Sequence, residues 1–108
     1  MPQSRRPQLE LSKLFKECYV EQRHVPTFRI LLGGVWKESS ARRTMDVSSP
    51  IDGTVIARVQ AGAARDAEDA VRTAYDSRRK IRDVPAIDRI DMLNRARHIL
   101  DAHKEDFV

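Results

Sequence analysis

The sequence predicts an α+β fold in which two antiparallel hairpins are followed by two amphipathic helices. The first observation is that short apolar runs between residues 28 and 59 alternate with glycine-containing turns. The second is that apolar residues recur at steps of three and four after residue 63, in an alanine-rich stretch. The third is Pro85, which divides that stretch into two helices. The 108 residues suit one small domain.

Composition and charge are those of a soluble globular chain, with 41% hydrophobic and 33% charged residues. The formal net charge of +4, from 20 basic and 16 acidic residues, permits contact with nucleic acid or an anionic ligand. The two signs are largely interleaved, which favours a solvated mixed surface over a nucleic-acid site. A small basic nucleic-acid binder therefore stays open as an alternative that rests on charge alone.

Cysteine usage and the N-terminus indicate a cytoplasmic protein. Cys18 is the single cysteine, so no internal disulfide can form, which fits a reducing compartment. No apolar run approaches the roughly 18 residues of a membrane span. The first residues contain arginines but no hydrophobic signal core, which argues against export.

Residues 1–27 are predicted to form an N-terminal arm with a short helix. Residues 1–8 are polar and contain two prolines, which favours disorder. Apolar residues recur at helical steps over Leu9–Gln22, which predicts an amphipathic helix, and Pro26 would break the pattern. The residues with this spacing are Leu11, Leu14, Phe15, Cys18 and Tyr19.

The first hairpin is expected to begin at Phe28. Phe28–Leu32 is a short apolar run, Gly33-Gly34 is a turn signal, and Val35-Trp36 starts a second strand. The polar residues 39–44 that follow should form a loop.

The second hairpin pairs Met45–Ser49 with Thr54–Val59 across the turn Pro50–Gly53. Val55, Ala57 and Val59 alternate onto one face of the returning strand. We therefore predict a small antiparallel sheet rather than a parallel one.

The helical half carries two amphipathic patterns. In the first, acidic residues fill the opening turns and basic residues the last turns, which suits both ends of the helix dipole. The second runs from about Ala86 to Lys104, with Pro85 near its first turn and Asp83 as a possible cap. A sheet this small cannot cover both helices, so some apolar face should meet a partner or a part of the fold that this chain lacks.

Two candidate sites lie in the first half of the chain. Gly33-Gly34 could cradle a phosphate, but a strand rather than a helix follows it, so a turn is the better interpretation. Cys18 could be a nucleophile, but it is expected on the apolar face of a helix with His24 beyond the helix end, which favours a packed thiol. Trp36 is interpreted as a hairpin anchor rather than a ligand platform.

Two further candidates lie in the helical half. His98 and Asp101 share a helix face, but His103 points elsewhere, so the spacing does not match a two-histidine metal site. The cluster Arg78, Arg79, Lys80 and Arg82 could bind an anion, although the helix dipole is a sufficient reason for its position. We therefore predict no catalytic, cofactor-binding or metal-binding residue in this chain.

Taken in order, the residues from Leu31 to Phe107 resemble the opening of the aldehyde dehydrogenase superfamily. The first matches are the hairpin residues Gly33, Gly34, Trp36, Pro50, Gly53 and the strand Val55-Ile56-Ala57. The segment "ARDAEDAVRTAY" is similar to the family's first helix. The last matches are Pro85, Arg89, Leu93 and Ile99-Leu100 in "PAIDRIDMLNRARHIL". The "SPID" and "RDVP" segments look most like an archaeal non-phosphorylating glyceraldehyde-3-phosphate dehydrogenase branch.

The resemblance implies that residues 28–108 are an incomplete N-terminal segment of an α/β coenzyme-binding domain. Such enzymes oxidise an aldehyde to a carboxylic acid with NAD or NADP, through a cysteine nucleophile, a glutamate base and an oxyanion-binding asparagine. These residues all lie beyond the equivalent of Val108, so this chain alone would be inactive and would bind no coenzyme. The implied partner is the missing remainder of the dehydrogenase or a companion subunit, and a homo-oligomer is possible.

Three departures from the family pattern stand out. Ser49 replaces the usual asparagine before proline, and Ala63 lies where a capping serine or threonine is usual, at a cost of about 1 kcal/mol. Residues 1–27 match nothing specific. The ending "HKEDFV" falls inside a helical pattern without a glycine cap, which predicts that the natural chain continues. A non-catalytic split subunit that docks on a partner chain remains the alternative.

Overall fold

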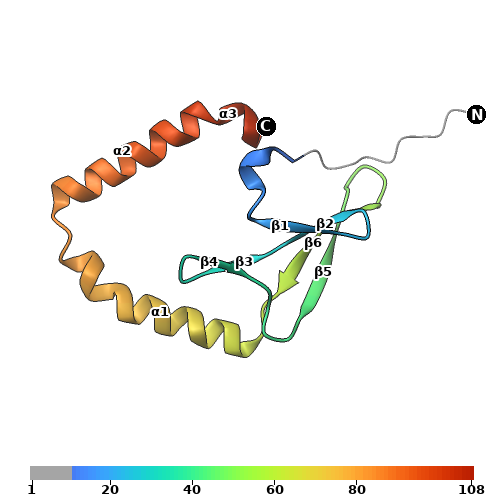
Figure 1. Cartoon of the computed structure of the whole chain (residues 1–108), viewed down its shortest axis with the longest axis horizontal. Coiled ribbons are helices and arrows are strands. Elements are labelled where there is room, and N and C mark those ends of the chain that lie inside the picture. The colour runs from blue at the N-terminus through green and yellow to red at the C-terminus, as the bar shows by residue number, and fades with distance from the viewer. Residues whose placement is uncertain (1–10) are drawn as a thin grey trace, which may run out of the picture.

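A computed structural model describes residues 11–108 (Figure 1). The element order is α+β, with strands first and helices afterwards, which confirms the predicted fold class. The predicted disordered arm over residues 1–8 lies outside the described residues.

The larger sheet has four strands in the order β1-β2-β6-β5. Its members are β1 (Tyr19–Gln22), β2 (Val25–Phe28), β5 (Arg43–Ser48) and β6 (Val55–Ala61). The pairs β1–β2 and β5–β6 are antiparallel, but β2 and β6 run parallel. The prediction of a wholly antiparallel sheet is therefore wrong. The parallel contact pairs Thr27 with Arg58 and Phe28 with Val59, which are 31 positions apart, whereas hairpin signals report only neighbouring strands.

The predicted helix over Leu9–Gln22 is also wrong. Within the described part of this stretch, residues 11–22, only η1 (Lys13–Phe15) is helical, as one 3₁₀ turn, and the chain then enters β1. The reason is tertiary: Tyr19 is paired with Phe28 across the β1–β2 hairpin, with ring centroids 5.7 Å apart. A cross-strand aromatic pair of this kind outweighs a weak helical preference. Pro26 lies inside β2 instead of ending a helix.

The hairpin of β3 (Ile30–Leu32) and β4 (Val35–Lys37) confirms the predicted first hairpin and its turn. Its predicted start at Phe28 is wrong, because Phe28 belongs to β2 and pairs with Tyr19 and Val59. Gly33 and Gly34 have φ values of 61° and 79°, which a residue with a Cβ adopts only with strain. This hairpin forms a separate two-stranded sheet.

The predicted second hairpin is confirmed as β5 and β6. Its turn is held by local hydrogen bonds: Gly53 N donates to Ser49 O at 2.9 Å, and Thr54 N donates to Asp52 Oδ1 at 3.0 Å. These bonds are typical of the Asp and Ser residues that favour turns. Arg58 Nε and Asp46 Oδ1, 2.9 Å apart, form a cross-strand ion pair.

Two long helices follow, as predicted: α1 (Ala64–Arg82) and α2 (Ala86–Ala102). A short helix, α3 (Lys104–Phe107), continues after a break at His103. Asp83, a possible cap of α2 from the sequence, is instead the C-cap residue of α1, and Pro85 is the N-cap residue of α2. The link between the helices is therefore Asp83 to Pro85, and its first and last residues are the C-cap of α1 and the N-cap of α2.

The start of α1 is fixed by the carboxylate of Asp66, which is only 6% exposed. Asp66 Oδ2 accepts hydrogen bonds from Ala63 N at 2.8 Å and from Ser40 Oγ at 3.1 Å, and Ser40 N donates to the same carboxylate at 3.1 Å. Ala63 has no side-chain oxygen that could cap the helix. The bond from Ala63 N to Asp66 is the contact that the third helical residue makes in a capping box, and it partly replaces the missing cap. The same carboxylate ties the loop between β4 and β5 to the helix.

These bonds hold the pKa of Asp66 below its ordinary value, with the Ala63 amide as the main cause. A lowered pKa means that the folded state favours the ionised form. The stabilisation by Asp66 is therefore present above the ordinary carboxyl pKa and is lost as the pH falls through the lowered pKa.

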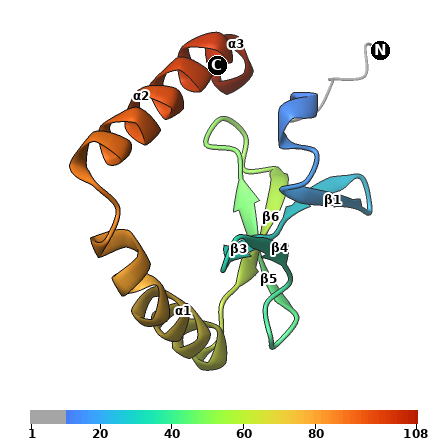
Figure 2. The same ribbon diagram turned by 60° about the vertical axis from the view of Figure 1, so that its left-hand side comes forward.

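The helices extend away from the sheet and form an open arch (Figures 1 and 2). The radius of gyration is 18.0 Å, against about 13 Å for a compact chain of this length. Among the described residues, Ala57 is the only buried apolar side chain. Every residue of α2 is exposed. The chain therefore has almost no hydrophobic core of its own.

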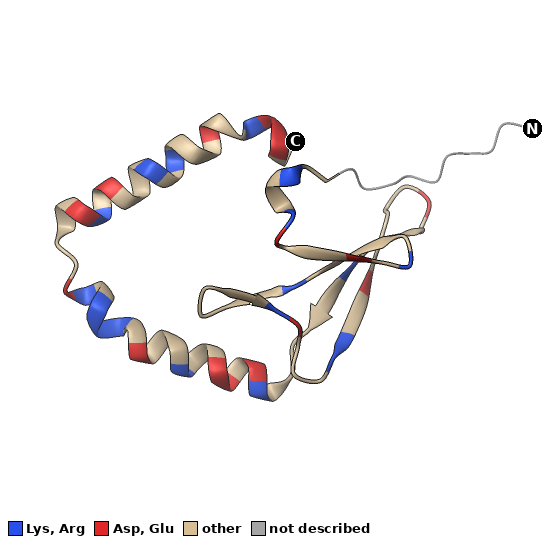
Figure 3. Cartoon of the chain, in the orientation of Figure 1, with Lys and Arg blue, Asp and Glu red and all other residues tan. Residues whose placement is uncertain are grey.

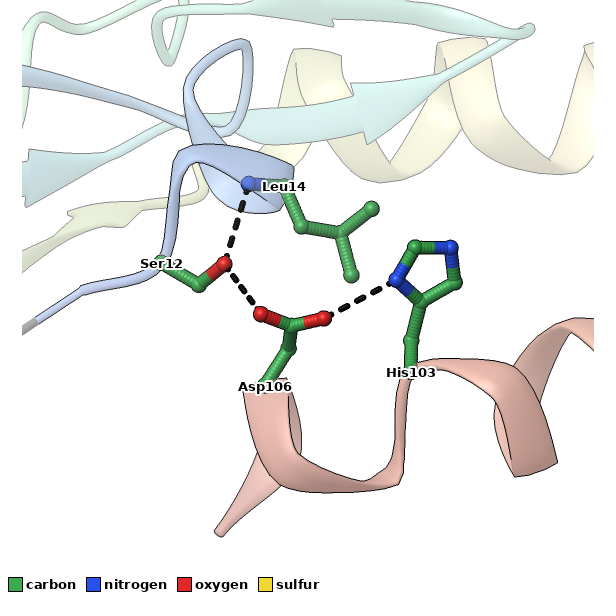
Figure 4. Close-up of polar contacts among 4 residues, drawn as sticks. All are labelled: Ser12, Leu14, His103 and Asp106. Atoms are coloured by element: carbon green, nitrogen blue, oxygen red, sulfur yellow. Dashed lines mark hydrogen bonds and ion pairs between the residues drawn. The ribbon is translucent and has the colours of Figure 1, made fainter.

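A small group of residues, here called the clasp, joins the two ends of the described chain (Figure 4). Ser12 Oγ donates to Asp106 Oδ1 at 2.5 Å, and His103 Nδ1 lies 2.9 Å from Asp106 Oδ2. The rings of Phe15 and Phe107 meet edge to face, with centroids 5.3 Å apart. The clasp brings η1 onto α3 and closes the arch.

The first prediction concerns Asp66. Replacing it with Asn removes the charge that strengthens its hydrogen bonds, so the amides of Ser40 and Ala63 should exchange with solvent about tenfold faster. NMR-detected hydrogen exchange on the 108-residue chain would measure both rates. Glu68→Gln makes the same charge change on an exposed residue of the same helix and should leave both rates unchanged. Equal acceleration in the two variants would contradict a specific role for Asp66.

The second prediction concerns the clasp in acid. Hydrogen bonds from Ser12 and then His103 lower the pKa of Asp106 from its ordinary value of 3.8. The clasp should therefore be intact above that value and open as the pH falls through the lowered pKa. Contacts between the rings of Phe15 and Phe107 in an NMR pH titration would report the opening.

Matched variants separate the clasp from general acid unfolding. Asp106→Asn should weaken the ring contact already at neutral pH, whereas Glu105→Gln on the neighbouring exposed residue should not. A ring contact that survives in Asp106→Asn would show that the aromatic pair holds the clasp without the carboxylate.

Candidate functional site: the uncovered faces of α1 and α2

Helix α1 approaches the β3–β4 hairpin with its small and polar side. A Cβ added at Gly33 would lie 3.5 Å from Thr73 Cγ2, so the hairpin turn and this helix face are in contact range. Thr73 Oγ1 donates to Asp69 O and Ser77 Oγ donates to Thr73 O, which satisfies both hydroxyls within the helix. The more buried residues on this side of α1 are Asp66, Asp69, Thr73 and Ser77.

The apolar residues of α1 lie on another side and face solvent. This α1 stripe consists of Ala67, Val71, Ala74, Tyr75 and Ile81, which share one face at 100° per residue. Val71 is 70% exposed and Tyr75 is 61% exposed. A shallow groove of about 530 Å³ lies along the stripe and is lined by Ala67, Glu68, Val71, Arg72 and Tyr75. Soluble proteins rarely leave such a face without a covering element.

Helix α2 has no single apolar stripe, because its apolar side chains are mixed around the helix with Arg89, Asn94, Arg97 and Asp101. Its large apolar side chains spread over about 240° at 100° per residue, and Leu93 is 72% exposed. These residues are Ile87, Ile90, Met92, Leu93, Ile99 and Leu100. The other side carries a charged band, the α2 polar strip, within about 80°. The polar strip consists of Asp88, Asp91, Arg95 and His98.

An open groove of about 720 Å³ lies in the elbow between the helices. It is lined by residues of both signs, including Lys80, Asp83, Asp88, Arg95 and His98. No cysteine, serine or threonine lines it, so it offers no hydroxyl or thiol nucleophile beside a base.

The structure places the first two sequence candidates in turns. Gly33 and Gly34 connect β3 to β4, and the element that follows is a strand. Cys18 was expected in the middle of a helix, which is wrong. It is half-buried in the turn between η1 and β1, where its amide donates to Phe15 O and its carbonyl accepts from Arg29 N.

The histidines of α2 are not brought together. His98 lines the elbow groove, whereas His103 belongs to the clasp. Within residues 11–108, no group of three or more His, Cys, Asp or Glu side chains is arranged to hold a metal ion.

Four basic residues, Arg78, Arg79, Lys80 and Arg82, lie close together at the C-terminal end of α1, and further basic residues are spread over α2 and the strands (Figure 3). The Arg78 guanidinium lies 3.6 Å from the centre of the Tyr75 ring, a cation–π contact. Arg82 Nε lies 3.6 Å from Asp83 Oδ1 on the exposed surface. Two of the four cations of this cluster are therefore engaged within the chain.

Sequence analysis missed the association of Ser12, Asp106 and His103 (Figure 4). The composition is that of a catalytic triad, but the order is different. Asp106 lies between the other two, so Ser12 donates to the carboxylate and not to the imidazole. A triad needs the imidazole next to the hydroxyl to take its proton, so this group is structural. Ser12 and Asp106 are 94 residues apart in the sequence, so no local signal could have paired them.

The described residues do not fit a dinucleotide coenzyme. Binding of its pyrophosphate usually needs a glycine-rich turn that leads into a helix. Here the glycine pair leads into β4, and the start of α1 already holds the carboxylate of Asp66. That negative charge would repel a phosphate.

In the described range, none of the helices is both long and apolar enough to cross a bilayer.

Comparison with known proteins gives a consistent result. Residues 36–108 match the Aldehyde dehydrogenase family. Malonate-semialdehyde dehydrogenase 1 of Geobacillus kaustophilus is 33% identical over 77 residues, which cover 71% of this chain and 16% of that protein. Mitochondrial succinate-semialdehyde dehydrogenase of Arabidopsis thaliana is 32% identical over 76 residues, covering 70% and 14%. D-glyceraldehyde dehydrogenase (NADP(+)) of Thermoplasma acidophilum is 27% identical over 78 residues, covering 72% and 16%.

The chain thus spans about a sixth of the length of these relatives. The matched region includes Trp36, the β5–β6 hairpin and both long helices, whose uncovered faces carry its apolar side chains. This chain belongs to the aldehyde dehydrogenase family and corresponds to its N-terminal portion.

Proposed function

We propose that these residues are the N-terminal portion of an enzyme that oxidises an aldehyde to a carboxylic acid with NAD or NADP. The observation that carries this proposal is the family match over residues 36–108. The relatives' names describe aldehyde oxidation, and one of them names NADP(+). The described residues contribute no nucleophile beside a base and no phosphate cradle, so their role in this enzyme is that of a scaffold.

The relatives support an aldehyde substrate without narrowing it further. Their names include malonate semialdehyde, succinate semialdehyde, D-glyceraldehyde and vanillin. The D-glyceraldehyde enzyme is 27% identical and the malonate-semialdehyde enzyme 33%. Identity therefore does not favour a glyceraldehyde-type branch, and that assignment stays a prediction.

We also propose that this enzyme is cytoplasmic. It rests on the one free cysteine, Cys18, since cytosolic proteins keep their thiols reduced.

The third prediction tests the proposed function on the native polypeptide. Its intact mass, measured from the source, should be several times the 12.4 kDa of this chain. The same preparation should reduce NAD or NADP when given one of the aldehydes named above, and a thiol-alkylating reagent should abolish that activity. The purified 108-residue chain is the control and should show no aldehyde-dependent reduction. A native mass of 12.4 kDa with no companion polypeptide and no activity would refute the enzyme proposal.

A further inference from the structure

The segment that precedes the family match is bound into the fold at both of its ends. Residues 11–28 lie before residues 36–108, which match the family. At one end of this segment β2 pairs in parallel with β6, with Phe28 opposite Val59. At the other end η1 contacts α3 through the clasp (Figures 1 and 4). The segment therefore connects the sheet with the far end of the helical arch.

The middle of the segment, here called the root, consists of Glu17 and Cys18 and is held by Arg29. Arg29 N donates to Cys18 O at 2.7 Å, and Arg29 Nη1 donates to Glu17 O at 3.3 Å. The strand β1 begins directly after the root and pairs along its whole length with β2. The acceptors at the root are backbone carbonyls and the donors are an amide and a guanidinium, so this anchoring does not depend on the carboxylate of Asp106.

The first part of the segment, here called the tip, consists of residues 12–15. Two side-chain contacts hold the tip to α3: the hydrogen bond from Ser12 Oγ to Asp106 Oδ1 and the edge-to-face contact of Phe15 with Phe107. Each contact of this kind is small beside the stability of a whole domain. Opening of the tip therefore costs much less free energy than global unfolding.

We propose that residues 11–28 are a brace that fixes α3 relative to the sheet, and that the tip of this brace opens as a unit while its root stays in place. The brace gives a role to a segment that lies outside the family match. The separate opening follows from unequal anchoring, because the root adjoins a paired strand whereas the tip depends on one carboxylate and one ring pair. The inference does not rest on the proposed function, since all of these contacts lie within the described chain.

The fourth prediction compares the tip with the root by limited proteolysis with trypsin. Lys13 is an exposed cleavage site in the tip, and Arg29 is a cleavage site at the root. In the native polypeptide at neutral pH, Asp106→Asn should raise the rate of cleavage after Lys13 about tenfold, because cleavage follows the population of the opened tip. The rate after Arg29 should stay within about twofold of its value in the unchanged protein. Mass spectrometry of the fragments measures both rates.

A second variant tests the brace from the side of α3. Phe15→Ala removes the ring contact, so cleavage after Lys104, an exposed site in α3, should become about tenfold faster. Each substitution is thus measured on a segment that it does not alter. Asp101→Asn makes the same carboxylate-to-amide change on an exposed residue of α2 and should leave the rates at all three sites unchanged.

Three outcomes would overturn the inference. Equal acceleration after Lys13 and Arg29 in Asp106→Asn would show that the tip and the root open together. An unchanged rate after Lys104 in Phe15→Ala would show that α3 is held in place without the brace. Rapid cleavage after Lys13 in the unchanged protein would show that the tip is not held at all.

Discussion

The carboxylate of Asp66 sets the geometry on which the rest of this structure depends. It accepts hydrogen bonds from the loop after β4 and from the residue before α1, and so fixes the point and direction at which α1 leaves the sheet. An ionised acceptor shared by three donors is stronger than a neutral one. Because the helix cannot rotate about its axis without losing these bonds, Asp66 also decides that Thr73 faces the β3–β4 hairpin and that Val71 and Tyr75 face outward.

The outward faces explain why the chain has so little core. The strands are held mainly by ladder hydrogen bonds and turn contacts, and only Ala57 is a buried apolar residue of the described chain. In proteins, most of the stability of a helix comes from tertiary packing of its apolar face rather than from intrinsic helix propensity. The described residues therefore give α1 and α2 little tertiary packing of this kind. The relatives are about six times as long as the matched region, so most of their residues lie outside the part that this chain resembles.

The clasp shows that the arch has a tertiary contact of its own. Ser12, Asp106 and His103 connect segments from opposite ends, and the Phe15–Phe107 pair adds an edge-to-face contact. It holds the end of α2 near η1 while the middle of the helix stays uncovered (Figures 1 and 4). A scaffold of this kind presents long apolar faces in a defined arrangement, which suits docking more than chemistry.

Local sequence patterns determined the elements that depend on near neighbours. The Gly33-Gly34 turn, the β5–β6 hairpin and the two helices divided near Pro85 all follow from turn residues and helical periodicity, which act over a few residues. The ordered motifs around Trp36, Pro50, Gly53 and Leu93 were sufficient to indicate the family. The β1–β2 hairpin is also local, but the helical spacing of apolar residues around Tyr19 hid its pairing with Phe28. Tertiary structure decided the parallel contact of β2 with β6, which depends on residues far apart in the sequence. It also decided the buried role of Asp66 and the outward direction of the apolar stripe, since periodicity shows that a helix has an apolar face but not what that face meets.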